Sequence, residues 1–211
     1  MSIFNEISST ISGMLAIKPV LEKELGSKWF SFIMECSKYS KEIFEKTKWA
    51  KEESEEAKYV KPLSFFVAVY LRLKEVVPSE RFDEVAQAFV EKAAFNSDMK
   101  VVKKYKFMKI KDSYKRWMFY EEKVMNDGFG LLQKHNLLIK QENKIHLQIT
   151  RCVFYDFFKE CGVPKLTCHI CDYDKLYHKT VFPEYQFDRN GDTKNTIAYN
   201  APQCDYVWKK L

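Results

Sequence analysis

The sequence predicts an α+β fold, in which a helical N-terminal half packs on a small antiparallel sheet that is accompanied by short helices in the C-terminal half. Up to about residue 95, apolar residues recur at spacings of three and four, which is the period of amphipathic helices. From residue 137 onward, short segments alternate apolar and polar residues, as half-buried strands do. No Gly/Ser-rich or Pro-rich linker separates the mainly helical residues 1–128 from residues 129–211. We therefore expect a single domain over residues 1–211.

The composition is that of a packed globular protein. Of 211 residues, 46% are hydrophobic and 16% are aromatic, with only six Gly and six Pro, which excludes a disordered chain. Much of the excess positive charge behind the formal value of +6 lies at residues 100–115. No finger, ribonucleoprotein or helix-turn-helix signature accompanies it, so we expect no nucleic-acid partner.

The chain contains no apolar run that approaches the roughly 20 residues needed to span a bilayer, and we expect no membrane partner. Residues 63–73 (LSFFVAVYLRL) are interrupted by Ser64 and Arg72 and predict a buried helix instead. The N-terminus has no basic region followed by an apolar core and a small-residue cleavage site. These features predict a cytoplasmic protein.

Glycine, proline and capping residues mark the expected helix ends. Gly26, Pro62 and Pro78 interrupt the helical period, and Ser79 is a candidate N-cap for the helix that follows. Residues 46–61 place Glu three or four positions from Lys, which predicts one exposed helix supported by ion pairs.

The next segments predict the transition from helix to sheet. Residues 113–125 are aromatic and amphipathic, and Asn126-Asp127-Gly128 is a stop signal suited to positive φ angles. One more short helix is expected at residues 129–135. Residues 137–139 and 144–150 then predict a hairpin that directs Ile145, Leu147 and Ile149 to one face.

Two further strands are predicted near the C-terminus. Residues 186–189 and 196–208 repeat the short alternating pattern on either side of Asn190-Gly191-Asp192, which is a strong turn signal. The C-terminal third is therefore expected to mix strands with short helices.

The six cysteines are expected to be free thiols, because clustered cysteines in a reducing compartment are more typically buried, metal-binding or reactive than disulfide-bonded. Cys152 and Cys161 are predicted to bracket one short helix, since Gly162 suits a helix stop and Pro164 suits the first turn of the next element.

Cys171 is the best candidate for an activated thiolate. Asp172 and Asp174 follow it at the predicted opening of a helix, where the pKa of a thiol can be lowered. In that helix, spacings of three, four and seven would place Asp174, Lys175 and His178 on the same side as Cys171.

The order of these residues resembles the C-terminal signature of the L-2-amino-thiazoline-4-carboxylic acid hydrolases. In that signature a Cys opens an apolar helix, and a Gly-x-Pro turn, a Cys-Asp-x-Asp step and a terminal Cys-Asp-aromatic follow. The resemblance covers about residues 129–208. The matching residues are Cys152, Gly162 with Pro164, Cys171-Asp172-Tyr173-Asp174 and Cys204-Asp205-Tyr206, with Phe182-Pro183 and Phe187 between them.

The resemblance implies a hydrolase that opens 2-amino-thiazoline-4-carboxylate, a cyclic isothiourea, to N-carbamoyl-L-cysteine. On this interpretation Cys171 attacks the electrophilic carbon or polarises the site, and Asp172 or Asp174 pairs with the amidinium and handles protons. Asp205 is the second carboxylate. The predicted site is completed by Cys152 and Cys204, and by Arg151 and Arg189 as clamps for the substrate carboxylate, since guanidinium presents paired donors.

This interpretation requires no cofactor, takes a small molecule as the partner and is compatible with a homo-oligomer. The alternative is a non-enzymatic sensor that binds a small ligand, a metal or haem. Cys168-x-x-Cys171 has the spacing of zinc ligands, although a second such pair is missing. Cys152, Cys204, His169 and His178 are candidates to complete the tetrahedron. For Cys36, Cys161 and Cys168, simple burial is favoured.

Overall fold

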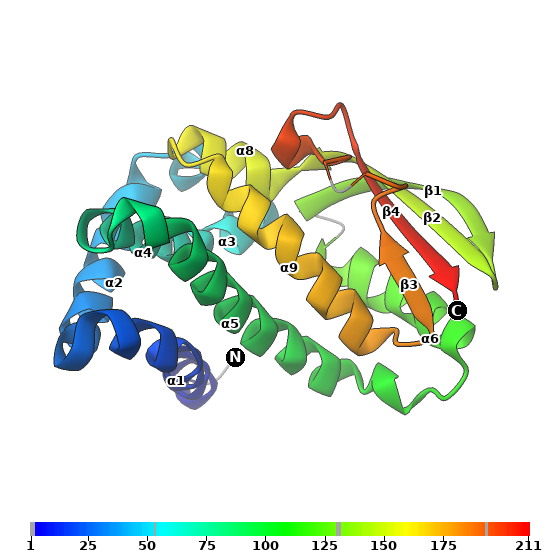
Figure 1. The fold of residues 1–211 in the computed structure, drawn as a ribbon, viewed down its shortest axis with the longest axis horizontal. Helices are drawn as coiled ribbons and strands as arrows, with labels where there is room; N and C mark the ends of the chain where they lie inside the picture. The colour runs from blue at the N-terminus through cyan, green and yellow to red at the C-terminus, as the bar shows by residue number, and fades with distance from the viewer. Residues whose placement is uncertain (1–2, 53, 130–131, 193) are drawn as a thin grey trace.

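The computed structural model describes residues 3–52, 54–129, 132–192 and 194–211. Long helices form one side of the protein and a four-stranded antiparallel sheet forms the other, with α5 and α9 packed side by side between them (Figure 1). This arrangement confirms the predicted α+β class. The α-helices are α1 (Ile3–Leu25), α2 (Trp29–Glu45), α3 (Glu55–Val60), α4 (Leu63–Val76), α5 (Ser79–Tyr105), α6 (Ser113–Phe119), α8 (Val153–Glu160) and α9 (Lys165–Val181). The 3₁₀-helices are η1 (Gly26–Lys28), η2 (Lys48–Lys51), η3 (Phe107–Lys109) and η5 (Ile197–Tyr199), and η4 (Tyr120–Phe129) is a π-helix.

The helix ends in the N-terminal part follow the predicted breaks. Gly26 has a φ of +56° and opens η1 directly after α1, a conformation that glycine adopts without steric cost. Pro62 and Pro78 directly precede α4 and α5, where a residue without a backbone N–H loses no helical hydrogen bond. The buried helix predicted at residues 63–73 is confirmed as α4. None of the helices described is both long and apolar enough to cross a membrane.

Two predictions for this part are wrong. Ser79 is the first residue of α5 rather than its N-cap, because the extended backbone of the cap position is already supplied by Pro78. The charged segment 46–61 divides into η2 and α3 instead of forming one exposed helix. Trp49 and Val60 are buried there, so packing of these two apolar side chains overrides the helical charge pattern.

The sheet has the strand order β1-β2-β4-β3. The predicted hairpin is confirmed as β1 (Gln133–Gln141) and β2 (Lys144–Cys152), and β4 (Cys204–Lys210) pairs with both β2 and the edge strand β3 (Tyr185–Asp188). Directly opposed residues of an antiparallel pair point to the same face. One buried face therefore carries Ile145, Leu147 and Ile149 of β2 together with their partners Trp208, Tyr206 and Cys204 of β4.

Three boundaries near the sheet differ from expectation. The helix expected to stop at Asn126-Asp127-Gly128 continues through them as η4, which has the wider turn of a π-helix. The short helix expected at 129–135 does not include residues 133–135, which belong to β1; residues 130 and 131 lie outside the described part of the chain. The strand expected at 196–208 begins only at Cys204, because Thr196 to Ala201 bond to one another locally instead of to a neighbouring strand.

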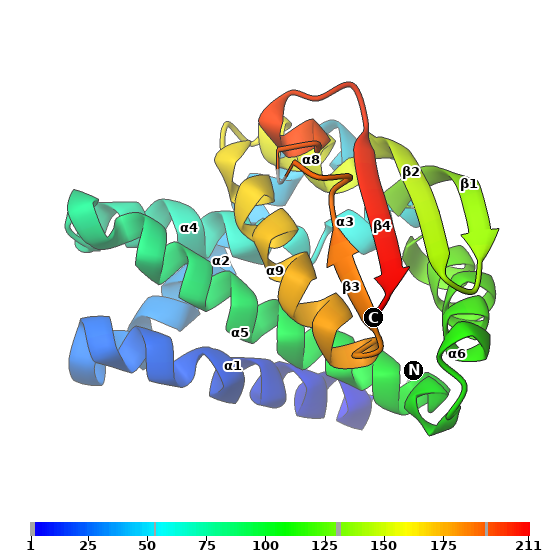
Figure 2. The ribbon, with the colours of Figure 1, turned by 45° about the vertical axis from the view of Figure 1, so that its right-hand side comes forward.

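Two hydrophobic clusters share helices α5 and α9. The first packs α1, α2, α4 and α8 against the N-terminal halves of these two helices, through residues such as Phe89 and Leu166. The second packs the sheet, α6 and η4 against their C-terminal halves, through residues such as Val102 and Tyr177. Figure 2 shows α9 lying between α5 and the strands β3 and β4. One helix thus contributes to the helical core and also presents side chains to the sheet.

The buried face of the sheet is expected to carry much of the stability. Replacing Leu147, which is fully buried, by Ala should lower the free energy of unfolding by about 2–5 kcal/mol, because it removes a packed side chain and leaves a cavity. Leu138 on β1 is half exposed, so Leu138→Ala should change it by less than about 1 kcal/mol. Urea denaturation of both variants measures the difference, and equal losses would contradict the proposed orientation of the strands.

Candidate functional site

A buried ion pair joins α9 to the sheet. The Asp174 carboxylate on α9 accepts hydrogen bonds from Arg189 Nη2 and from Tyr206 Oη of β4, the latter at 2.7 Å. Arg189 directly follows β3, and its guanidinium lies 4.0 Å from the centre of the Tyr206 ring. Burial raises the pKa of Asp174, and the neighbouring guanidinium opposes that rise. Arg189 and Asp174 therefore form a charged pair that both helix and sheet must position.

The guanidinium of Arg189 is not fully used by these contacts. Its side chain is only 2% exposed, and Nη2 also faces the Cys171 carbonyl oxygen at 3.4 Å. Nη1 has no hydrogen-bond partner among the described residues. A buried donor without a partner is costly, so this nitrogen is a candidate contact for a bound anionic group.

Three free thiols surround the ion pair. Cys171 lies beside Asp174 on α9, Cys204 begins β4, and Cys152 ends β2; each interacts electrostatically with Asp174. The backbone N–H of Ile197 points to Cys204 Sγ at 3.1 Å. Burial raises the pKa of all three, to about 12 for Cys152 and well above the usual value for Cys171. At neutral pH these groups are thiols rather than thiolates.

This result corrects the prediction that Cys171 opens a helix and has a lowered pKa. α9 begins at Lys165, after Pro164, so Cys171 lies in the second turn. The helix dipole acts mainly within the first turn, and burial dominates at Cys171. The bracketing of α8 by Cys152 and Cys161 is confirmed. Burial is also found for Cys36, which is fully enclosed, while Cys161 and Cys168 are half-buried.

The sequence also placed His178 and Lys175 on the same side of the helix as Cys171, and in the structure their surroundings differ. His178 is buried against Phe187, Tyr206 and Trp208, with ring centres 4.2 Å, 5.7 Å and 5.0 Å away. Burial lowers its pKa well below the usual value, and Arg189 lowers it further. The imidazole is therefore neutral and packs as an aromatic ring. Lys175 is exposed.

Asp98 is a member of the cluster that sequence reasoning missed. It lies on α5 and accepts a hydrogen bond from Tyr173 Oη of α9 at 2.8 Å. Burial, together with the negative charge of Asp174, raises the pKa of Asp98 to about 7, although the Tyr173 hydrogen bond opposes the change. No local motif marks this residue, since its partner lies 75 positions away in the sequence.

Three other predicted site residues, Asp205, Arg151 and Asp172, lie outside this cluster, as does Cys168. Asp205 points to the opposite face of the sheet from Cys204 and Tyr206, where its carboxylate bonds to His146 Nε2 at 2.7 Å. Arg151 is held by Glu56 and Asp156, and this pairing leaves it less suited to clamp a substrate. Asp172 is exposed on the other side of α9. Cys168 also points away, toward the Ala198 carbonyl oxygen at 3.5 Å.

The two thiols of Cys168-x-x-Cys171, considered from their spacing as zinc ligands, have different neighbours in the structure. Cys168 contacts the segment around η5, whereas Cys171 faces Arg189. Among the residues that the structure describes, no three His, Cys, Asp or Glu side chains are grouped so that they could hold a metal ion.

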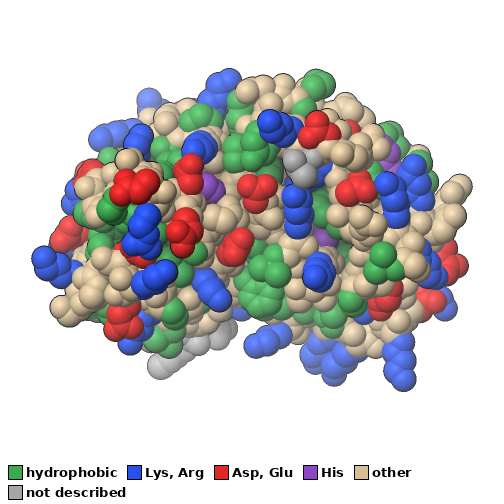
Figure 3. Space-filling view, in the orientation of Figure 1, with side chains coloured by type: hydrophobic (Ala, Val, Ile, Leu, Met, Phe, Trp, Pro, Cys, Tyr) green, Lys and Arg blue, Asp and Glu red, His purple; other side chains and the backbone are tan. Residues whose placement is uncertain are grey.

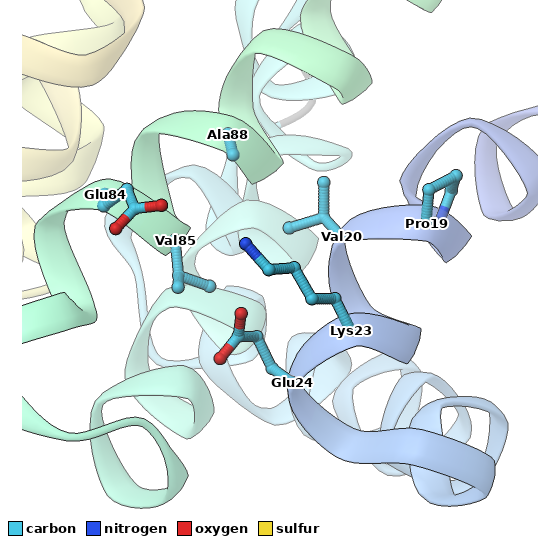
Figure 4. A pocket seen from close by; sticks show the side chains of 7 residues that line it. All are labelled: Pro19, Val20, Lys23, Glu24, Glu84, Val85 and Ala88. Carbon is cyan, nitrogen blue, oxygen red and sulfur yellow. The ribbon is translucent and has the colours of Figure 1, made fainter.

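Two cavities lie elsewhere on the surface. The larger, of about 410 Å³, lies between α5 and α9 and includes Cys168 and Asp172. The smaller, of about 220 Å³, lies between α1 and α5, where Lys23 extends across from α1 toward α5 (Figure 4). Its Glu24 is bound by Arg81 through both carboxylate oxygens. No thiol or histidine lines this smaller cavity, so it offers little for catalysis.

The raised pKa of Asp98 predicts a pH-dependent contribution to stability. The carboxyl has a pKa of about 7 when folded and 3.8 in its ordinary state, so the folded protein binds the extra proton between these values. Stability should therefore fall as pH rises through this window. Asp98→Asn cannot titrate. The free energy of unfolding of the wild type, measured against that of this variant in urea at several pH values, should decline between about pH 4 and pH 7. Parallel curves would show that Asp98 has an ordinary pKa.

Comparison with known proteins identifies the family of the chain. The family model described as L-2-amino-thiazoline-4-carboxylic acid hydrolase matches residues 59–208, whereas neither a curated protein nor a solved structure matches significantly. The matched range includes Asp98, Asp174, Arg189 and Tyr206, together with the three thiols around them. Because the match covers more than half of the chain, this protein belongs to the L-2-amino-thiazoline-4-carboxylic acid hydrolase family.

Proposed function

We propose that this protein hydrolyses a small cyclic isothiourea, with 2-amino-thiazoline-4-carboxylate as the reference substrate, at the cluster formed by Asp174, Arg189 and their neighbouring thiols. The observation that carries the proposal is the convergence of Cys152, Cys171, Asp174 and Cys204 around one buried ion pair. They come from three different elements, and packing alone does not require a charged pair at that position.

The side chains available match the needs of such a substrate. Its amidinium requires a carboxylate, which Asp174 supplies, and its own carboxylate requires a cation, for which Arg189 Nη1 is the donor without a partner. Cys171, Asp98 and Asp174 each retain some exposure to solvent, and in the proposed mechanism the substrate enters by this route. Water provides the remaining reactant.

Net hydrolysis adds one water across the bond between the amidine carbon and the ring sulfur. The water oxygen bonds to that carbon, the carbon–sulfur bond breaks, and the sulfur leaves as a thiol after taking a proton; the product is N-carbamoyl-L-cysteine. Asp98, whose pKa is raised to about 7, is suited to hold the proton that moves from water to sulfur, since a pKa near neutrality favours both acceptance and donation.

The protonation of the thiols favours attack by water over attack by cysteine. A thiolate is the nucleophilic form of Cys, and burial raises the pKa of Cys171 well above its usual value. In this mechanism Cys171 acts as a neutral hydrogen-bonding group beside the ion pair, and the carboxylates carry the chemistry.

Asp174→Asn is expected to lower kcat/KM for thiol release from 2-amino-thiazoline-4-carboxylate by about 10²–10⁴-fold, because it removes the charge that pairs with both the amidinium and Arg189. The matched control is Asp112→Asn, at the N-cap of α6, where Asn also caps well. Thiol release is followed with a chromogenic disulfide reagent. Full activity of Asp174→Asn in folded protein would contradict the assignment.

The water mechanism predicts that no covalent intermediate forms on Cys171. Intact-protein mass spectrometry after acid quench during turnover should show the unmodified mass, and Cys171→Ala should retain measurable turnover. Cys161→Ala, which alters a half-buried thiol at the end of α8, is the control for loss of a cysteine. An adduct that is present in the wild type and missing in Cys171→Ala would establish nucleophilic catalysis by this thiol instead.

A further inference from the structure

The cavity of about 410 Å³ lies on the opposite side of α9 from the Asp174 cluster. Residues spaced three or four positions apart on α5 and α9 supply most of its wall, and the segment before β4 closes one side. Figure 3 shows acidic side chains gathered on this face, over α5 and the N-terminal half of α9. The lining residues are Asp83, Gln87 and Glu91 of α5, Lys165, Cys168, His169 and Asp172 of α9, and Tyr199 of η5.

The wall of this cavity is negatively charged although the protein is basic. Three carboxylates face a single lysine, so the formal charge of the wall is −2, against +6 for the whole chain. Lys165 bonds to both oxygens of Asp83, at 2.8 Å and 2.7 Å, and this pair largely neutralises itself. The net charge therefore resides on Glu91 and Asp172.

Neither of these two carboxylates has a cationic partner among the described residues. Glu91 accepts a hydrogen bond at 3.0 Å from the neutral amide of Gln87. Asp172 accepts no hydrogen bond and forms no ion pair with any residue that the structure describes; its negative charge raises the pKa values of Cys168 and Tyr199, for which burial is the larger cause. Unpaired carboxylates in a concave wall attract small cations.

His169 lines the same wall, and one of its ring nitrogens is buried without a hydrogen-bond partner among the described residues. Gln87 donates from its amide nitrogen to Glu91 and to the His169 carbonyl oxygen, so its amide oxygen must face His169 Nδ1, 2.8 Å away. Burial lowers the pKa of His169, and the neutral ring thus carries its proton on Nδ1. Nε2 is then an acceptor, and it has no partner among the described residues.

The remaining wall suits an organic cation better than a metal ion. Tyr199 is partly exposed and offers an aromatic ring, and Cys168 is a thiol whose pKa burial raises above its usual value. Aromatic faces and polarisable sulfur favour cations with planar, weakly hydrated groups. Together with the two carboxylates of the wall, they form a site that favours a positive charge carrying N–H donors.

We infer that this cavity binds a small organic cation of the amidinium or guanidinium class, with Asp172 and Glu91 as the charge partners and Tyr199 against the planar group. This site is separate from the Asp174 cluster, and the inference stands on the charge and hydrogen-bonding groups of the cavity wall alone. It does not depend on whether the protein hydrolyses an isothiourea.

The test compares benzamidinium with benzamide, which has nearly the same shape but no charge, by calorimetric titration into the full chain at neutral pH and constant ionic strength. Benzamidinium should bind at least about tenfold more tightly than benzamide, since only the cation pairs with the carboxylates. Asp172→Asn should weaken benzamidinium binding by about three- to tenfold. Lys165→Met should strengthen it by about twofold or more, because it removes the only positive charge of the wall and frees Asp83.

The opposite signs of these two effects separate charge recognition from misfolding, because a damaged cavity would lose affinity in both variants. Asp192→Asn is the matched control; Asp192 lies in the turn after β3, where it accepts a hydrogen bond from the Lys194 backbone N–H, and it should not change binding. Equal binding of benzamide, no effect of Asp172→Asn, or weaker binding in Lys165→Met would each overturn the inference. A loss of benzamidinium binding in Asp174→Asn with none in Asp172→Asn would also overturn it, by moving the cation to the other side of α9.

Discussion

The Asp174–Arg189 ion pair is the constraint on which the arrangement of α9, β3 and β4 depends. A guanidinium that is almost wholly removed from solvent is stable only when a carboxylate faces it. Asp174 comes from the helix, Arg189 follows the edge strand, and Tyr206 of the neighbouring strand bonds to the same carboxylate oxygen. A shift of α9 along the sheet would leave one of these charges buried without its partner. The pair thus fixes the position of the helix, in addition to the apolar contacts of His178 with Phe187 and Trp208.

Helix α9 separates two chemically different environments. The helical period directs Cys171, Asp174 and His178 toward the sheet, while Lys165, Cys168 and Asp172 face α5 and the larger cavity. On the first side the charges are paired and the thiols are buried; on the second, two carboxylates have no cationic partner within the described part of the chain. Within the segment Cys171-Asp172-Tyr173-Asp174, Asp174 therefore faces the first environment and Asp172 faces the second. We propose that the first side performs hydrolysis and that the second recognises a cation.

The cysteines are prominent in the sequence, but burial shifts the pKa values of the carboxylates, rather than those of the thiols, in the direction that favours proton transfer. Burial makes every thiol near the ion pair harder to ionise, and this weakens the case for cysteine as nucleophile. At Asp98 the same desolvation raises the pKa to about 7. A carboxyl group with this pKa can both accept and donate a proton near neutral pH. Its hydrogen bond to Tyr173 holds it beside the helix that carries Asp174.

The sequence by itself determined the features that depend on neighbouring residues. Hydrophobic periodicity predicted the α+β class, the buried helix α4 and the β1–β2 hairpin with its buried Ile145, Leu147 and Ile149, and the glycine and proline positions predicted several helix ends. The ordered signature from Cys152 to Tyr206 predicted the family. Only the tertiary structure decided where α9 begins, that Asp98 joins Tyr173 across 75 residues, and that Asp172, Arg151 and Asp205 lie apart from Asp174. The reason is physical: propensity and period act over a few residues, whereas the burial and charge pairing that set a pKa arise from segments far apart in the chain.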